Sequence, residues 1–283
     1  MSRADWNVGP VTRYGLFWTL LPLTLSGLSG CTTGEASPST ALAPIPARHV
    51  VSIAAASDLK FALDDLAKRF EQAEPDVELR ITHGSSGNFF AQIRNHAPFD
   101  VYLSADREYP ERLIKEGLAM EETLVLYGIG HLVIWVPNDS PLDPSLVGME
   151  ALVDAAAHKV AIANPAHAPY GRAAVAALQH AGIYDRVRDR LVLGENVTQA
   201  AQYVASGAAD AGIIALSLAS APIMRDKGRY WQVPPDSYPR LDQAGVILSS
   251  TKDLVAARKF TSYLSGEHGR QILQSYGFAL PGE

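Results

Sequence analysis

Apolar and polar residues follow two recurring patterns along this chain, one with the period of a strand and one with the period of a helix. The first clear case is an apolar run over residues 50–56 that ends in Ser57 and Asp58. Apolar residues at helical spacing follow over residues 59–70, which predicts a buried strand running into a helix capped by Ser57 or Asp58. A helix start leaves backbone N–H groups unpaired and carries partial positive charge, so this turn is a candidate anion site.

The alternation of strand-like and helix-like segments continues to the C-terminus and predicts an α/β fold with largely parallel sheets. The predicted strands cover residues 49–55, 77–83, 99–104, 125–136, 159–163, 191–197, 211–214, 230–233 and 244–248. The predicted helices cover residues of about 59–73, 147–157, 172–181, 198–206, 253–265 and 267–275, with two more after residues 88 and 106.

Two lobes are predicted because residues 125–136 have the pattern of a crossing segment and residues 244–248 that of a return. We expect lobe I to comprise residues 49–130 and 245–283, and lobe II residues 131–244. Two α/β lobes joined in this way are typical of binding proteins that close around a ligand at a hinge.

The N-terminal segment has the pattern of an export signal. Arg3 and Arg13 precede an apolar segment over residues 16–25, and Leu28-Ser29-Gly30-Cys31 follows. That ending resembles the lipobox of bacterial lipoproteins, which implies lipidation at Cys31 after removal of the leader. A plain signal peptide or a short membrane anchor is the alternative, although a spanning helix needs ~20 apolar residues. Residues 32–48 are rich in Ser, Thr, Ala and Pro and are predicted to form a flexible tether.

Composition narrows the class of protein. Apolar residues make up 47% and charged residues 19% of the chain, as in ordinary globular proteins. The net charge of −6 argues against a nucleic-acid partner, and it means that an anion must be held by local geometry. The single cysteine, Cys31, excludes an internal disulfide and any Cys-based metal site.

Four turns at predicted helix starts look alike, two in each lobe. They are Ala56-Ser57-Asp58, Ser85-Ser86-Gly87, Pro169-Tyr170-Gly171 and Glu195-Asn196-Val197. In parallel α/β sheets such turns lie at the carboxyl ends of strands, where ligands bind. Only Arg172 brings a positive charge near them. A site of hydroxyls and backbone amides suits a fully ionised oxyanion, whereas each serine taken alone could equally be a helix cap.

The chain resembles the periplasmic molybdate-binding proteins of ABC transporters (the ModA family) from about residue 50 to residue 278. The motifs that carry the resemblance are Ala54-Ala55-Ala56-Ser57, Gly84-Ser85-Ser86 with Ala91-Gln92-Ile93, Ala97-Pro98-Phe99-Asp100-Val101 with Leu103-Ser104-Ala105-Asp106, and Tyr276-Gly277-Phe278. The resemblance implies a two-lobed periplasmic-binding-protein fold of type II, with the ligand in the cleft and a hinge between the lobes.

The resemblance also implies the ligand, its contacts and the partners. Molybdate, and commonly tungstate, would be held by the hydroxyl and amide of Ser57 and Ser86, with the Asp58 amide adding a bond. In lobe II the contacts fall on the amides of Tyr170 and Val197. We expect a monomer anchored to a membrane through Cys31, in the periplasm or at the cell surface, that delivers its ligand to permease and ATPase subunits.

One family feature is missing. Many members carry a ligand tyrosine after the late Gly-Ile-Val strand, but Ala215 follows Gly212-Ile213-Ile214 here. Other members carry a tyrosine in the Pro-x-Gly loop, where Tyr170 stands. We therefore expect the Tyr170 hydroxyl to donate to the anion in place of the missing one; the alternative is an aromatic lid residue packed on the hinge.

Other classes of function fit the sequence less well. No Gly-x-Ser-x-Gly elbow and no His-Glu-x-x-His motif is present, so we expect no enzyme, no catalytic residue and no cofactor. His83 and His167 are expected near the site as supporting or loop residues. No Tyr-Tyr pair points to a ferric site, and no metal cation is expected. The alternatives are a binding protein of this fold for sulfate or phosphate, or an oxyanion sensor that works without a transporter.

Overall fold

The computed structural model describes residues 48–282. The predicted leader, the lipidation site Cys31 and the tether up to residue 47 lie outside the described residues. Arg48, assigned to the tether, is bonded to the fold: its guanidinium donates to the carbonyls of Pro75 (3.2 Å) and Val77 (3.0 Å). No helix within residues 48–282 has the length and apolar character needed to cross a membrane.

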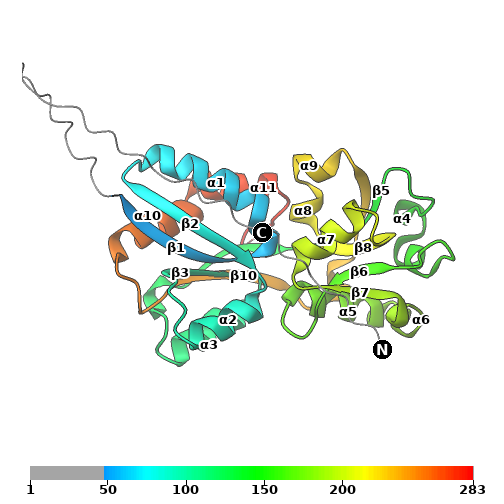
Figure 1. The fold of residues 1–283 in the computed structure, drawn as a ribbon, viewed down its shortest axis with the longest axis horizontal. Coiled ribbons are helices and arrows are strands. Elements are labelled where there is room, and N and C mark those ends of the chain that lie inside the picture. The colour runs from blue at the N-terminus through cyan, green and yellow to red at the C-terminus, as the bar shows by residue number, and fades with distance from the viewer. Residues whose placement is uncertain (1–47, 283) are drawn as a thin grey trace, which may run out of the picture. The chain divides into compact units, whose positions relative to one another are not determined.

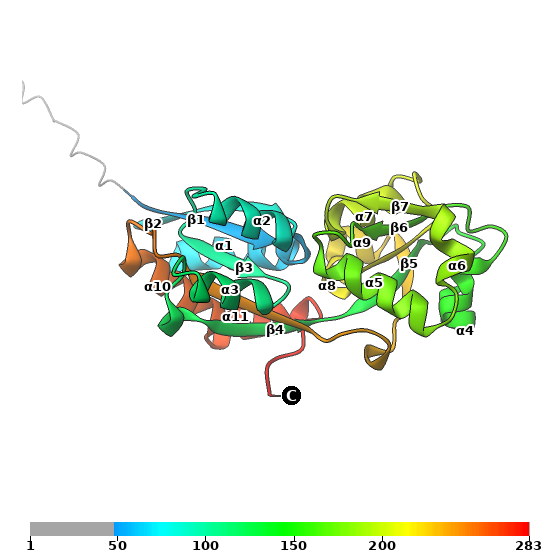
Figure 2. The ribbon, with the colours of Figure 1, turned by 90° about the horizontal axis from the view of Figure 1, so that it is seen from below.

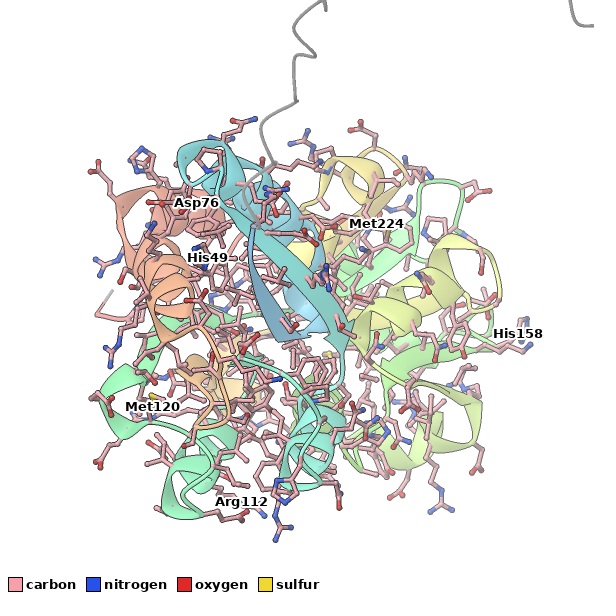
Figure 3. All side chains as sticks on the ribbon, turned by 60° about the vertical axis from the view of Figure 1, so that its left-hand side comes forward. His49, Asp76, Arg112, Met120, His158 and Met224 are labelled. Carbon is pink, nitrogen blue, oxygen red and sulfur yellow. The ribbon has the colours of Figure 1, made fainter. Side chains whose placement is uncertain are left out.

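The first sheet contains five strands in the order β2-β1-β3-β10-β4 (Figure 1). They are β1 (His49–Ala56), β2 (Val77–Gly84), β3 (Val101–Ser104), β4 (Val125–Gly130) and β10 (Leu241–Ile247). Strand β1 runs parallel to β2 and β3, whereas β10 is antiparallel to β3 and β4. The pairing of β1 with β2 begins beside His49 and Asp76 (Figure 3), where the His49 amide donates to the Asp76 carbonyl at 2.8 Å.

Alternation of side chains assigns each face of this sheet to different helices. Val51 and Ile53 of β1 share a core with helices α1 (Lys60–Ala73), α10 (Leu254–Ser265) and α11 (Glu267–Ser275). Ala54 lies in a separate core with α2 (Ser86–Arg94) and α3 (Glu108–Lys115). This period of two is the one expected for a strand buried on both faces. The sheet and these helices are called lobe I below.

The second sheet has the order β7-β6-β8-β5-β9. Its strands are β5 (Leu132–Pro137), β6 (Val160–Ala163), β7 (Leu191–Gly194), β8 (Ala211–Ala215) and β9 (Gly228–Gln232). The helices with it are α4 (Pro144–Val147), α5 (Pro169–His180), α6 (Tyr184–Val187), α7 (Val197–Ala205), α8 (Leu216–Ala219) and α9 (Pro222–Arg225). Figure 1 shows α5 and α7 on opposite faces of this sheet. This group is called lobe II.

The α/β class and the two-sheet arrangement are confirmed, and two details of the prediction were wrong. The sheets are mixed: β6 is parallel to β7 and β8, but β5 is antiparallel to β8 and β9. The helix predicted over residues 147–157 is a single turn, α4, followed by a 3₁₀ segment over Gly148–Val153. Gly148, at φ +58°, interrupts the helical geometry there.

The chain changes sheets at two places. It leaves the first sheet after Gly130, at the end of β4, and enters the second at Leu132 in β5; it returns in β10, which starts at Leu241 (Figure 2). The return strand therefore begins three residues before the predicted Ala244. Gly130 pairs with Leu241, so the two crossing segments lie side by side.

Candidate functional site

The turns singled out in the sequence converge on one small cavity between the lobes. The cavity has a volume of about 10 Å³ and is lined by Ala56, Ser57, Asp58, Gly84, Ser85, Ser86, Ala105, Ala168, Pro169, Tyr170, Asn196 and Val197. These residues follow the carboxyl ends of β1, β2, β3, β6 and β7, the edge at which α/β sheets bind ligands. No Lys, Arg or His is among the described residues that line it.

Ser86 is held so that its hydroxyl proton is available to a ligand. It is buried at the first position of α2, and its Oγ accepts a hydrogen bond from the Ala105 amide at 3.0 Å. Its carbonyl accepts the Tyr102 hydroxyl at 2.7 Å. Because the hydroxyl oxygen already accepts from Ala105, its own O–H remains to donate toward the cavity.

Ser57 is fixed through its backbone. The Thr198 hydroxyl, from α7 in lobe II, donates to the Ser57 carbonyl at 2.7 Å. The next carbonyl, that of Asp58, accepts the Ser217 hydroxyl from α8 at 2.7 Å. Within the described residues no protein group is hydrogen-bonded to the Ser57 hydroxyl, so it too is free to act as a donor.

The lobe II side of the cavity consists of two helix starts. Helix α5 begins with Pro169, which has no N–H, so the Tyr170 amide is the first donor of that helix. Helix α7 begins at Val197 behind Asn196, whose side chain accepts the Gln199 amide at 3.0 Å. The first amides of a helix have no partner within it, so those of Tyr170 and Val197 are available to an anion.

The Tyr170 hydroxyl differs from the expectation. It donates to Asp58 Oδ2 at 3.0 Å and accepts from Gln243 Nε2 at 3.2 Å. A hydroxyl has a single proton, so the predicted donation from this group to the anion is not what the structure has. A side chain at Gly130 would collide with both the Tyr170 hydroxyl and the Gln243 amide, which explains why a glycine occupies this crossing segment.

Asp58 lines the cavity but its carboxyl group belongs to a buried polar cluster. Oδ2 accepts from both the Tyr170 hydroxyl and Gln243 Nε2, whereas Oδ1 has no partner among the described residues. Burial raises the pKa of Asp58 from 3.8 to about 6, and the hydrogen bonds from Gln243 and Tyr170 oppose that rise. Burial likewise raises the pKa of the Tyr170 hydroxyl well above its ordinary value, so it stays protonated.

Two of the predicted neighbours take different places. The Ser85 hydroxyl donates to the His167 carbonyl at 2.7 Å, and His167 Nδ1 lies 3.0 Å from the same hydroxyl. The Gly87 amide also donates to the His167 carbonyl, at 2.9 Å, so His167 joins lobe II to the start of α2. His83 does not line the cavity; its Nε2 lies 3.3 Å from Asp64 Oδ1.

The rim of the cavity carries the charged contacts between the lobes. Arg172 at the start of α5 pairs with Asp106 of lobe I at 2.5 Å and donates to the Tyr109 hydroxyl at 3.1 Å. These residues border a hollow of about 470 Å³ that shares Ala105 and Pro169 with the cavity and that Arg112 also lines. Arg172, the one positive charge predicted near the four turns, thus lies beside the cavity and is paired with Asp106.

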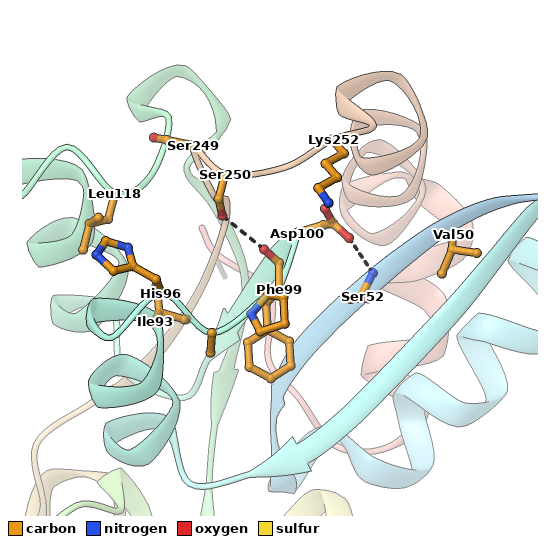
Figure 4. Close-up of a pocket in the computed structure, with 12 residues that line it drawn as sticks. Val50, Ser52, Ile93, His96, Phe99, Asp100, Leu118, Ser249, Ser250 and Lys252 are labelled. Carbon is orange, nitrogen blue, oxygen red and sulfur yellow. Dashed lines mark hydrogen bonds between the residues drawn. The ribbon is translucent and has the colours of Figure 1, made fainter.

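Another hollow, of about 420 Å³ and far larger than the cavity of about 10 Å³, lies at the opposite edge of lobe I (Figure 4). Its main polar group is already satisfied, because Asp100 Oδ2 accepts the Ser52 amide at 2.8 Å and Oδ1 accepts the Thr251 hydroxyl at 2.8 Å. It lies at the amino ends of β1 and β3, away from the edge at which these sheets bind ligands. Size alone therefore does not identify the site in this protein.

Within residues 48–282 no three His, Cys, Asp or Glu side chains are grouped so that they could hold a metal ion. The sequence signals that were not recognised are the hydroxyls that join the lobes, Thr198 and Ser217, and the amide of Gln243. Thr198 and Ser217 lie within three residues of predicted helix or strand ends, as ligand-facing residues do. Gln243 stands directly before a predicted strand, at its amino end, and ligands are expected at the carboxyl ends.

Comparison with known proteins gives one consistent result. Residues 51–279 match the family described as bacterial extracellular solute-binding protein. The molybdate-binding protein ModA of Azotobacter vinelandii is 36% identical over 230 residues, which cover 81% of this chain and 90% of the relative. ModA of Rhodobacter capsulatus is 34% identical over 195 residues, with 69% of this chain and 75% of the relative covered. The solved structure of the Azotobacter vinelandii periplasmic molybdate-binding protein superposes with a TM-score of 0.77 at 33% identity, over 82% of this chain and 99% of that chain.

Proposed function

This chain belongs to the bacterial extracellular solute-binding proteins, and from that premise we propose that it captures molybdate between its two lobes for an ABC importer. The observation that carries the proposal is the cavity itself. Hydroxyls from lobe I and helix-start amides from lobe II face one small space that no Lys, Arg or His of the described chain lines. Neutral donors in this number fit an oxyanion that keeps no proton and needs donors on every oxygen.

Each lobe has a separate role in the proposal. Ser57 and Ser86 donate from lobe I through hydroxyl and amide, and the Asp58 amide lies beside them. Tyr170 and Val197 donate from lobe II through their backbone amides, while the Tyr170 hydroxyl positions Asp58. Closure brings the two sets together, because the bonds from Thr198 and Ser217 join α7 and α8 to the turn after β1.

We expect selectivity to follow from the number of donors that each anion can reach once the lobes have closed on it. Sulfate is a smaller tetrahedron than molybdate or tungstate and would leave some donors without a partner. Each buried donor left unpaired costs ~1–3 kcal/mol, so two missed bonds reduce affinity by roughly tens- to thousands-fold. Tungstate nearly matches molybdate in size and is expected to bind as well.

Calorimetric titration of the purified protein with molybdate, tungstate, sulfate and phosphate tests the proposal. We expect micromolar or tighter binding of molybdate and tungstate that a large excess of sulfate leaves almost unchanged. Equal affinity for sulfate would instead assign the protein to a different oxyanion, and the absence of binding by all four anions would contradict an oxyanion-binding role.

The cellular setting is a further part of the proposal. We infer that Cys31 carries a lipid, that the folded domain works outside the cytoplasm as a monomer, and that it delivers its ligand to permease and ATPase subunits. Metabolic labelling with a fatty acid tests the anchor, and Cys31→Ala should abolish both the label and membrane retention. Stimulation of a reconstituted importer's ATPase by the loaded protein tests delivery; a sensor would not stimulate it.

A further inference from the structure

We propose that this site binds one proton together with its anion, and that the carboxyl group of Asp58 carries that proton. The inference rests on the proposed function, because it concerns the same cavity. It makes the affinity for the anion depend on pH, which neutral donors alone would not do. In the buried cluster of Asp58, Tyr170 and Gln243, two acceptor atoms have no hydrogen-bond donor among the described residues.

The cluster is short of one donor. The side-chain protons that reach it are those of the Tyr170 hydroxyl and the Gln243 amide, and all of the contacts that they make converge on Asp58 Oδ2 and on Tyr170 itself. The backbone amides of Asp58 and Leu59 also face the carboxyl group and lower its pKa, but neither makes a hydrogen bond to Oδ1. Two acceptors, Asp58 Oδ1 and Gln243 Oε1, are buried without any partner among the described residues. Buried acceptors are normally satisfied, so one more proton is what the arrangement lacks. Protonation of Asp58 would remove the negative charge from this cluster and turn one unpaired acceptor, Oδ1, into a donor.

No positive charge takes the place of that proton. The turn Ser57–Leu59 packs against α1, β2, α7 and α8, and Tyr170 and Gln243 reach it from α5 and β10. The charged or titratable groups of α1 and β2 that lie nearest pair with one another: Lys60 with Asp64 at 3.3 Å, and Asp64 with His83 at 3.3 Å. The remaining titratable groups on these elements and on β4 are Asp65, Lys68, Arg69, Glu71, Glu78, Arg80, Tyr127, Arg172, His180, Tyr203 and Asp242.

Of that remaining set, the groups close to Asp58 add no cation. Tyr127 stays neutral, because burial raises its pKa well above the ordinary value and the Asp58 charge adds to that rise. Arg172 is engaged by Asp106 at the rim. An ionised Asp58 would therefore be an uncompensated buried charge, which is costly even before a ligand binds.

An incoming dianion makes this cost larger. Asp58 is buried and lines the cavity, so molybdate would bring two negative charges close to the residue that carries this carboxyl group. Like charges at such a site favour protonation of the carboxyl group. The pKa of Asp58, already raised to about 6 by burial, rises further in the complex. At neutral pH the anion then binds with a proton taken from solvent onto Asp58, and no other bond changes.

The sign of the pH dependence follows by linkage. Below a pH of about 6, Asp58 is protonated before the anion arrives, so affinity is at its plateau and no proton is taken up. Above it, binding must protonate Asp58, and Kd rises by about tenfold per pH unit until the pKa of the complex is passed. An oxyanion that already carries a proton, such as hydrogen phosphate, would bring the proton itself and would show no net uptake.

Calorimetry with molybdate between pH 5 and pH 8.5, in pairs of buffers with different ionisation enthalpies, tests the inference. For the unaltered protein we expect an uptake that approaches one proton per molybdate above pH 7, together with the rise in Kd. For Asp58→Asn we expect no uptake, a Kd that does not vary with pH, and tighter binding than the unaltered protein at pH 8.5. Asp139→Asn removes an exposed carboxylate from lobe II and should behave as the unaltered protein.

The outcomes separate this inference from the proposed function. Tight molybdate binding with no proton uptake and no pH dependence in the unaltered protein would overturn the role of Asp58 and leave molybdate capture standing. Proton uptake that persists in Asp58→Asn would also overturn the role of Asp58, because another group would then carry the proton. Failure of the unaltered protein to bind any oxyanion at any pH would overturn the proposed function, and the inference with it.

Discussion

In lobe I, side chains face the cavity, and hydrogen bonds from neighbouring groups hold them in place. In lobe II, backbone amides face the cavity, and the geometry of the helix starts holds them in place. The Ser86 hydroxyl depends on the Ala105 amide, and the Ser86 carbonyl on the Tyr102 hydroxyl. The position of the Val197 amide is set only by the start of helix α7, which Asn196 caps. Among the groups that face the anion, deletion of one side chain should therefore weaken binding in lobe I, whereas in lobe II the N–H itself must be removed.

The largest effect on binding is expected from Ser86→Ala. The change removes a hydroxyl donor and also leaves the Ala105 amide buried without its acceptor. We expect molybdate affinity to fall roughly 10- to 100-fold, as measured by calorimetry. Ser249→Ala changes an exposed serine of the hollow of about 420 Å³; it is the control and should leave Kd unchanged. Equal effects of the two changes would remove Ser86 from the site.

Val197→Pro is the sharpest test of lobe II. Proline is well tolerated at the first position of a helix and deletes only the N–H, and the extended Asn196 before it suits proline. We expect roughly a tenfold or greater loss of affinity, corresponding to one donor worth ~1–3 kcal/mol. Val197→Ala keeps the amide and should stay within about threefold of the unaltered protein. If alanine weakens binding as much as proline does, the side chain matters and the contrast between the lobes fails.

Asp58→Asn should change stability in a pH-dependent way. The pKa of Asp58 is raised from 3.8 in the unfolded chain to about 6 in the fold, so the native state holds the extra proton between these values. The contribution of Asp58 to stability is therefore greatest below pH 4 and falls as the pH rises through 6. At pH 8 we expect the asparagine variant to be more stable than the unaltered protein by ~1–3 kcal/mol in urea unfolding without ligand. A difference that is the same at pH 4.5 and pH 8 would contradict the assignment.

Tyr170→Phe is expected to have the smallest effect on affinity. It keeps the backbone amide and removes only the hydroxyl that donates to Asp58, so the direct loss at pH 5 should be less than about tenfold. Because Asp58 then loses a donor to its carboxylate, its pKa should rise, and the fall in affinity with pH should start at a higher pH. A large loss of affinity at pH 5 would indicate that the hydroxyl binds the anion directly. Lobe II would then, like lobe I, contribute a side-chain donor.

The sequence predicted the parts of the fold and site that local patterns encode. The run before Ser57, the Ser85-Ser86-Gly87 turn and the start of α5 each combine a strand end with a helix start, and the structure brings all of them to one cavity. The mixed sheets were not predicted because β10 and β5 have the same apolar pattern whichever way they run. The direction of a strand depends on its partner, which the local pattern does not specify.

The protein contacts of the Tyr170 hydroxyl were not predicted for a similar reason. Its partners are Asp58, 112 residues earlier, and Gln243, 73 residues later, and neither lies in a motif that points to the other. The family resemblance predicted a tyrosine at the site, and Tyr170 lines the cavity, but the resemblance could not say where its hydroxyl points. That depends on Gly130, whose missing side chain leaves the hydroxyl room to reach Asp58.

The position of β10 has a consequence for how the protein is made. The sheet of lobe I takes its fourth strand in spatial order from residues 241–247, whereas every strand of the second sheet lies within residues 132–232. During synthesis the second sheet can therefore assemble from a contiguous stretch while lobe I still lacks β10. Since the first sheet must close a loop of more than a hundred residues, we expect lobe I to be the slower to fold and α10 and α11 to complete it last. The lobe that provides the serine donors is then the one whose nascent form most needs protection from premature association.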